Sequence, residues 1–175
     1  NYGTTLDQIG KIAVTQRANA QLNPQALLRE PMTIKDYLDS RLISDPIRLF
    51  DCVMPCSGAE CVILASEEKA RRITDKMVYL VSDAEKINYQ VEEMLPDKTT
   101  TGIKIVGERL FSEVPRDQID VFEIYDDYPI AVLIQIEDLG YCKKGQGGKF
   151  VEERDLSFAG DFPLNTGGGE LSVGQ

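Results

Sequence analysis

The 175-residue chain is long enough for one domain with its own core, since a chain of this size buries roughly 70% of the surface that its unfolded form exposes. Its hydrophobic content of 42% and its charged content of 27% are those of a globular protein. The formal net charge of −10 argues against nucleic acid and anionic membranes as partners, because both attract clustered Lys and Arg.

The sequence contains no histidine, which narrows the groups that could move a proton near neutral pH. Any proton transfer must therefore use a tyrosine, a cysteine, a lysine or a carboxylate. No stretch resembles a signal peptide, and no apolar run approaches the roughly 20 residues of a membrane span. The chain begins at Asn1 rather than at a methionine, which we interpret as the mark of a fragment.

The four cysteines are Cys52, Cys56, Cys61 and Cys142. Their C-x3-C-x4-C spacing, with no histidine and a distant fourth cysteine, is a poor pattern for zinc. We therefore predict no metal site. With no secretion signal, we expect reduced thiols that pack in the core or line a site, and a cytoplasmic protein.

The first third of the chain predicts two helices and a loop. Residues 5–24 predict one helix, because Thr5 and Gln8 form a capping box, apolar residues recur at helical spacing and Pro24 ends the pattern. A short helix is expected after Thr33, which supplies its N-cap. Prolines and a glycine interrupt residues 40–58, so we expect a loop there.

Strands alternate with helices in the rest of the prediction. Runs rich in Val and Ile predict strands over residues 58–66 and 77–84, with a helix over 67–73 between them. A polar stretch over 94–102 precedes a helix over 103–114. A third strand should end near Tyr125, and a helix should follow, with Pro129 in its first turn and Gly140 at its C-cap. That helix is apolar nearly all round, which predicts burial, and the alternation as a whole indicates an α/β fold with a layered sheet.

Tyr125 is a candidate site residue because ligands of layered α/β folds lie beyond the carboxyl ends of the strands. Asp126, Asp127 and Tyr128 follow it. Asp127 or Tyr128 could simply cap the next helix. For Tyr125 the pattern alone favours packing in the core over a role in a site.

Four stretches of the sequence resemble the later half of a thiolase-superfamily subunit of the sterol-carrier-protein type. They are YGTTLDQIGKIAVTQRANAQLNP (2–24), DCVMPCSGAECVILASEEKA (51–70), EIYDDYPIAVLIQIEDLGYCKKGQGGKF (123–150) and FPLNTGGGELSVGQ (162–175). The second resembles the family's D-C-x-x-x-x-D-G-A-A-A-x-x-L-A-S segment, with Ser57 where Asp is usual, and the fourth resembles its N-x-x-G-G-x-x-x-x-G-H-P loop.

This resemblance implies a partial thiolase-like fold, layered α-β-α-β-α, that consists mainly of the C-terminal half. Residues 1–75 would form the end of the N-terminal half, and residues 76–175 would form a C-terminal domain cut at its G-H-P-type loop. The half with the nucleophilic cysteine would lie upstream of Asn1, and the acid/base cysteine downstream of Gln175. Cys52 and Cys142 fall where the family often carries cysteine, and we interpret both as packing residues.

The resemblance also assigns the site residues. Gln175 takes the position of the loop histidine, and Tyr125 takes the position of the Asn or His of an N-E-A-F or H-D-C-F motif. An amide cannot accept a proton as imidazole does, although it can donate to an oxyanion. Tyrosine can donate or, with a lowered pKa, carry a proton. Binding of a coenzyme A thioester is assigned to Asp127, Gly168, Gly169 and Ser172, and the loop Asp51–Ser57 could face the coenzyme A chain.

Three functions remain open from the sequence. The resemblance implies an acyl-coenzyme-A enzyme of lipid or steroid side-chain metabolism that makes or breaks a C–C bond by acyl transfer, with coenzyme A thioester as substrate and no bound cofactor. The first alternative is a retro-aldolase that acts on a β-hydroxyacyl-coenzyme-A ester through Tyr125, which resembles the steroid side-chain aldolases and their small OB-fold partner subunits. The second alternative is a non-catalytic binding subunit. A homodimer or tetramer is what the family implies.

Overall fold

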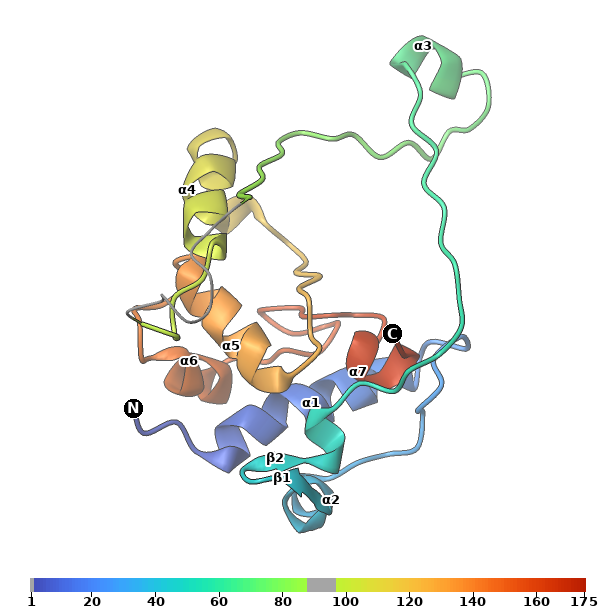
Figure 1. The fold of residues 1–175 in the computed structure, drawn as a ribbon. Helices are drawn as coiled ribbons and strands as arrows, with labels where there is room; N and C mark the ends of the chain where they lie inside the picture. Colours follow the sequence, from blue (N-terminus) through green and yellow to red (C-terminus); the bar gives the residue numbers. More distant parts are fainter. Residues whose placement is uncertain (1, 88–96) are drawn as a thin grey trace.

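The computed structural model describes residues 2–87 and 97–175 (Figure 1). Its helices are α1 (Leu6–Ala20), α2 (Ile34–Asp39), α3 (Glu67–Ala70), α4 (Ile103–Glu113), α5 (Pro129–Asp138), α6 (Gly147–Glu153) and α7 (Glu170–Val173). The 3-10 turns η1 (Leu49–Asp51) and η3 (Arg116–Gln118) and the strands β1 (Leu42–Ser44) and β2 (Ile47–Arg48) complete the named elements. Within this part of the chain, no helix combines the length and the apolar character needed to cross a membrane.

Helix α1 lies at the centre of the fold and contacts α2, α5, α6 and α7 (Figure 1). The predicted capping box starts it: the Gln8 amide N–H donates to Thr5 Oγ1 at 3.3 Å, and the Thr5 N–H donates to Gln8 Oε1 at 3.1 Å. The helix ends at Ala20, before Pro24. The helix predicted over 5–24 is therefore confirmed, with its end a few residues earlier.

The main core forms where α5 and α6 pack beside α1. Its buried members are Ile12, Phe122, Val132, Leu133, Ile136, Val151, Leu156, Phe162 and Leu164. The rings of Phe122 and Phe162 stack with centroids 4.4 Å apart. As predicted, α5 begins at Pro129. Its C-cap is Leu139 rather than the predicted Gly140, which comes one residue later with φ +81°. The sequence of α5 predicts burial nearly all round the helix. Ile130 and Ile134 are only half-buried, so one side of α5 is more buried than the other.

A second, smaller core joins α1 to α2. Thr33 caps α2 as predicted, and Tyr37 is fully buried, with its hydroxyl donating to Asp51 Oδ1 at 2.5 Å. The prediction of a plain loop over 40–58 was wrong in its first part, since β1 and β2 form a short antiparallel hairpin there. Pro46 is tolerated because it lies in the turn and not in a strand.

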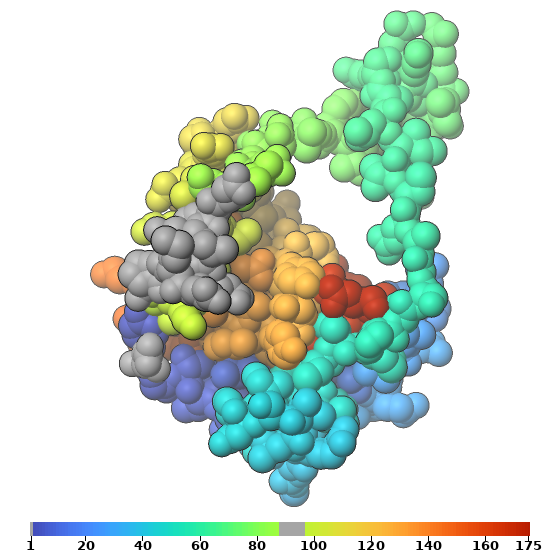
Figure 2. Space-filling model, in the orientation of Figure 1, coloured from blue at the N-terminus to red at the C-terminus, as the bar shows by residue number. Residues whose placement is uncertain are grey.

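The strands predicted over 58–66 and 77–84 were wrong as elements of this structure. The two segments flank α3 on an arm that projects from the body (green in Figures 1 and 2). Val62, Leu64 and Val78 are 83%, 87% and 99% exposed. A strand needs a neighbour for its backbone N–H and C=O groups, and within residues 2–87 and 97–175 neither segment has one.

The strand predicted before Tyr125 is reduced to a single parallel bridge between Phe122 and Leu164. The helix predicted over 103–114 is confirmed as α4, whereas only the first part of the helix predicted over 67–73 forms, as α3. The start of the polar stretch predicted over 94–102 lies outside the described residues. The layered sheet therefore stays a prediction, and the described part combines helices with one small hairpin.

Candidate functional site

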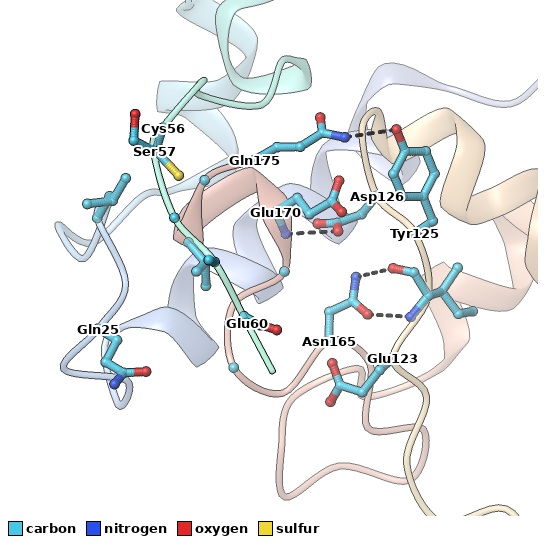
Figure 3. A pocket seen from close by; sticks show the side chains of 18 residues that line it. Gln25, Cys56, Ser57, Glu60, Glu123, Tyr125, Asp126, Asn165, Glu170 and Gln175 are labelled. Atoms are coloured by element: carbon cyan, nitrogen blue, oxygen red, sulfur yellow. Dashed lines mark hydrogen bonds between the residues drawn. The ribbon is translucent and has the colours of Figure 1, made fainter. Parts of the chain in front are cut away.

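A cavity of about 920 Å³ opens where three distant parts of the chain meet (Figure 3). Residues 56–60 form one wall, residues 123–126 form another, and residues from Asn165 to Gln175 form the third, with Gln25 and Leu27 at the edge. Each of the three walls comes from a stretch that carries the family resemblance. The fold thus gathers into one cavity motifs that lie far apart in the sequence.

Tyr125 and Gln175, the two predicted catalytic residues, meet in this cavity. Gln175 Nε2 donates a hydrogen bond to Tyr125 Oη at 3.0 Å (Figure 3). Since the phenol oxygen is the acceptor, its own proton is free for another partner. Tyr125 is 52% exposed, so the core packing that the pattern alone favours was wrong.

The backbone of the second motif holds Gln175 in place. The Gln175 N–H donates to the Met54 carbonyl oxygen at 3.0 Å, and the Cys56 N–H donates to the Gln175 carbonyl oxygen at 2.7 Å. Cys56 and Ser57, from the loop expected to face coenzyme A, line the cavity. The loop Asp51–Ser57 therefore both positions Gln175 and forms part of the wall.

Asp126 fastens the start of α7 to the segment that carries Tyr125. Its carboxylate is 2% exposed and accepts the N–H groups of Glu170 at 2.9 Å and of Leu171 at 3.2 Å. Burial raises the pKa of Asp126, and these backbone donors oppose that rise. Sequence reasoning missed Asp126, because one acidic residue between two candidates carries no pattern of its own.

Asn165 aligns the glycine-rich loop with the same segment. Its Oδ1 accepts the Ile124 N–H at 2.7 Å, and its Nδ2 donates to the Ile124 carbonyl oxygen at 2.9 Å. The side chain thus pairs with the backbone as a neighbouring strand would. Asn165 has φ +44°, a conformation that asparagine tolerates better than most residues. The Asn of the predicted loop motif therefore has a clear structural role.

The two glycines assigned to coenzyme A binding have different surroundings. A Cβ on Gly168 would lie 2.6 Å from the Ala20 Cβ, so Gly168 permits close packing on α1. A Cβ on Gly169 would lie 2.1 Å from Asp126 Oδ2. Gly169 lines the cavity and Gly168 is not among its lining residues. Binding of coenzyme A by either glycine stays a prediction.

Ser172 and Asp127 are not among the lining residues either. Ser172 is buried, and its Oγ accepts a hydrogen bond from Arg17 Nε at 3.1 Å. Asp127 is half-buried, and its Oδ1 accepts the Tyr128 N–H at 2.9 Å. Tyr128, rather than Asp127, takes the N-cap position of α5. The assignment of both residues to substrate binding stays a prediction.

The cysteines are all free thiols in this structure. Burial raises the pKa of Cys142 to about 11, and burial followed by the nearby Asp51 raises the pKa of Cys52. A thiol with a raised pKa holds little reactive thiolate at neutral pH, which agrees with packing roles for both. Among the described residues, no three His, Cys, Asp or Glu side chains gather as a metal site would require.

Comparison with known proteins gives a consistent family. The family model described as "Thiolase C-terminal domain-like" matches residues 84–175, just over half of the chain. The acetyl-CoA acetyltransferase of Methanothermobacter thermautotrophicus is 32% identical over 99% of this chain and 46% of its own length. The steroid side-chain-cleaving aldolase of Thermomonospora curvata is 31% identical over 97% of this chain and 46% of its own.

A solved structure described as "Ltp2-ChsH2(DUF35) aldolase" aligns with a TM-score of 0.83 at 26% identity, over 98% of this chain and 47% of that one. The chain thus spans about half the length of the relatives that it matches. The family match extends through the wall of the cavity from residue 123 to Gln175. The chain belongs to the thiolase family, and its matched region is similar to the C-terminal domain of thiolases.

Proposed function

We propose that this chain forms the Tyr125–Gln175 wall of an active site that makes or breaks a C–C bond in a coenzyme A thioester. The observation that carries the proposal is the 3.0 Å hydrogen bond from Gln175 Nε2 to Tyr125 Oη inside the cavity. A tyrosine that accepts from an amide presents its own O–H to a ligand. Such a donor can stabilise the negative charge that develops on a thioester oxygen when a C–C bond breaks.

Aldol cleavage is the finer function that we propose within this class. The residue at the histidine position of the predicted loop is Gln175, and an amide cannot accept a proton at neutral pH. Loss of the base that activates a nucleophile costs several orders of magnitude in rate, which disfavours ordinary thiolysis. Two relatives at 31% identity, a steroid side-chain-cleaving aldolase and a 17-hydroxy-3-oxo-4-pregnene-20-carboxyl-CoA lyase, support a lyase reaction.

Acyl transfer is the second candidate, because the acetyl-CoA acetyltransferase relative is as similar to this chain as the aldolase is. Acyl transfer would need a nucleophilic cysteine in addition to Tyr125 and Gln175. For partners, we propose a small OB-fold subunit, which the likeness to the Ltp2-ChsH2(DUF35) aldolase supports. A homodimer or tetramer also remains a proposal.

The test uses the full-length protein that contains this chain, together with its partner subunit if one co-purifies. It is incubated with a panel of β-hydroxyacyl-coenzyme-A esters, and separately with β-ketoacyl-coenzyme-A esters plus free coenzyme A. The proposal expects a shorter acyl-coenzyme A and a carbonyl product from the first panel, without consumption of free coenzyme A. Turnover of the second panel only, with an acyl adduct on a cysteine, would establish acyl transfer instead. No turnover of either panel would reject both reactions and favour a non-catalytic subunit.

A further inference from the structure

Glu170 shares the cavity with Tyr125 and Gln175, and none of the roles described above uses its side chain. It is the first residue of α7, and Asp126 accepts its backbone N–H. Figure 3 shows the Glu170 carboxylate between the Gln175 side chain and Asp126. In the thiolase-type loop, this acid therefore lies next to the pair proposed to contact substrate.

The surroundings of this carboxylate do not stabilise its charge. Glu170 Oε2 is buried and has no hydrogen-bond partner among the described residues. Its acidic neighbours are Asp126 and Asp127, and no lysine or arginine is found among the described residues that line the cavity. Burial, and then these two carboxylates, raise the pKa of Glu170.

Glu137 is a buried acid with a structural role in the same fold, and its partners differ from those of Glu170. Its Oε1 accepts the N–H groups of Gly145 at 3.0 Å and Gly147 at 2.7 Å. Its Oε2 lies 3.2 Å from Lys144 Nζ. Both oxygens of that carboxylate are satisfied, whereas Glu170 keeps a buried oxygen without a partner. A residue that costs stability inside a cavity is a candidate for function.

We propose that Glu170 is the proton-transferring group of this cavity, a role that rests on the proposed aldol cleavage. Its carboxylate accepts the β-hydroxyl proton of the substrate, and the O–H electron pair forms the carbonyl of the leaving product. The Cα–Cβ bond breaks, and its electron pair moves into the thioester enolate, whose oxygen accepts a hydrogen bond from Tyr125. Glu170 then returns the same proton to Cα, which yields the shorter acyl-coenzyme A with no oxidant or reductant.

The chemistry fits a chain without histidine, because a raised pKa makes a carboxylate a better proton acceptor and the carboxyl group can then return the proton. The groups that face Glu170 determine this behaviour. Asp126 and Asp127 come from the segment before α5, Glu60 and Glu123 lie on the other walls, and Tyr125 and Gln175 are neutral. All the charged members of this set are acidic, and Asp126 and Asp127 disfavour the ionised form of Glu170.

The test compares Glu170→Gln with Glu153→Gln, the same change on the exposed face of α6, in the full-length protein. We expect Glu170→Gln to lower kcat for cleavage by about 10²-fold to 10⁴-fold, as loss of a general acid/base does, and Glu170→Asp to restore part of it. The acid limb of the wild-type pH profile should lie above the ordinary glutamate pKa and should disappear in Glu170→Gln. Glu153→Gln should leave both unchanged.

The melting temperature provides a second readout, because Glu170→Gln should lower activity without lowering stability. The folded state binds the Glu170 proton more tightly than the unfolded chain does, so Glu170 favours folding at low pH and loses that effect as pH rises through its raised pKa. Glu170→Gln should therefore melt at or above the wild-type temperature at pH 7, with the gap closing toward pH 4. A lower melting temperature together with lost activity would show a structural acid and overturn the proposal.

Exchange of the α-protons of a saturated acyl-coenzyme A in D₂O separates this inference from the proposed function, because enolisation needs no C–C cleavage. Suppose that the wild-type protein exchanges the α-protons but cleaves no ester, and that Glu170→Gln abolishes the exchange. This result would support proton transfer by Glu170 and reject aldol cleavage. Exchange that persists in Glu170→Gln would overturn the proposed proton transfer by Glu170. If the wild-type protein shows no cleavage and no exchange, both the role of Glu170 and the proposed aldol cleavage are overturned.

Discussion

The hydroxyl of Tyr125 is made a better donor by the bond that it accepts. Hydrogen bonds in a chain polarise one another, so a phenol that accepts from Gln175 Nε2 can donate a stronger hydrogen bond to a ligand. The amide of Gln175 donates this hydrogen bond without changing its charge near neutral pH, whereas a histidine would titrate there. We therefore propose that Tyr125 and Gln175 act together as one oriented hydrogen-bond donor.

The three consecutive glycines from Gly167 to Gly169 provide a sharp test of the loop. Gly169→Ala should lower the free energy of unfolding by about 2 kcal/mol or more, since backbone strain of this kind costs about 1–3 kcal/mol before any clash is counted. Gly169 has φ +61°, and its new Cβ would lie 2.1 Å from Asp126 Oδ2. Denaturant unfolding measures the change.

Gly167→Ala is the matched control, because its new Cβ would meet only Asn23 Nδ2, at 3.6 Å. It should change the free energy of unfolding by no more than about 0.5 kcal/mol. Equal effects of the two substitutions would show that Asp126 does not lie over Gly169.

Tyr125 and Gln175 could be predicted as a pair because each replaces a characteristic residue in a recognisable segment. The structure brings the two side chains together in one cavity, and their catalytic role stays a prediction. Glu170 and Asp126 were missed, because an acid at a helix start or before a helix is ordinary in sequence. Their roles depend on the approach of two segments more than 40 positions apart, which only the fold shows.

The packing of α1 against α2 depends on a glycine in the middle of a helix. Gly10 lies under Tyr37, and a Cβ there would be 2.4 Å from Tyr37 Cδ1 and 2.7 Å from Ile34 Cδ1. Tyr37 cannot move freely, because its hydroxyl donates to Asp51 and its ring is fully buried. The glycine therefore sets how closely the two helices approach.

Gly10→Ala should destabilise the protein by about 1–2 kcal/mol in denaturant unfolding, since overpacking costs about 1–3 kcal/mol and better helix propensity returns up to about 1 kcal/mol. Gly107→Ala in α4 should cost less, because its closest neighbour, at 3.1 Å, is the flexible end of Leu139. A stabilised Gly10→Ala variant would mean that Tyr37 is free to retreat.

Element prediction was reliable where the signal is local. Capping boxes at Thr5 and Thr33, Pro129 and Gly140 mark helix ends by contacts within a few residues. The strands predicted over 58–66 and 77–84 have suitable apolar sequences. A strand also requires a neighbour at hydrogen-bonding distance, and a sequence run does not specify where that neighbour comes from.

The described part of the chain consists of a packed body and a projecting arm (Figure 2). Val62, Ile63 and Leu64 are each more than 80% exposed, as is Val78 on the returning segment. Exposed, unpaired runs of β-forming residues tend to associate with other chains. We therefore expect these exposed residues of the arm to promote self-association.

Leu64→Lys should reduce concentration-dependent association of the 175-residue chain, measured by light scattering, and should leave its melting temperature unchanged. Leu164→Lys is the matched control: the same change at a residue that is 1% exposed in the main core should abolish cooperative unfolding. A melting temperature that falls in Leu64→Lys would show that the arm packs on the body.

A double-mutant cycle on C–C cleavage by the full-length protein would show whether Tyr125 and Gln175 act as one unit on a coenzyme A thioester. The cycle compares wild type, Tyr125→Phe, Gln175→Ala and the double variant. We expect Tyr125→Phe to lower kcat by about 10²-fold or more and Gln175→Ala by less, as loss of an oxyanion donor and of its orienting partner should. Adding Gln175→Ala to Tyr125→Phe should then change kcat little further, because the bond between the two groups is already lost. Full activity in Tyr125→Phe, or two effects that simply add, would show that the two side chains do not act as one unit.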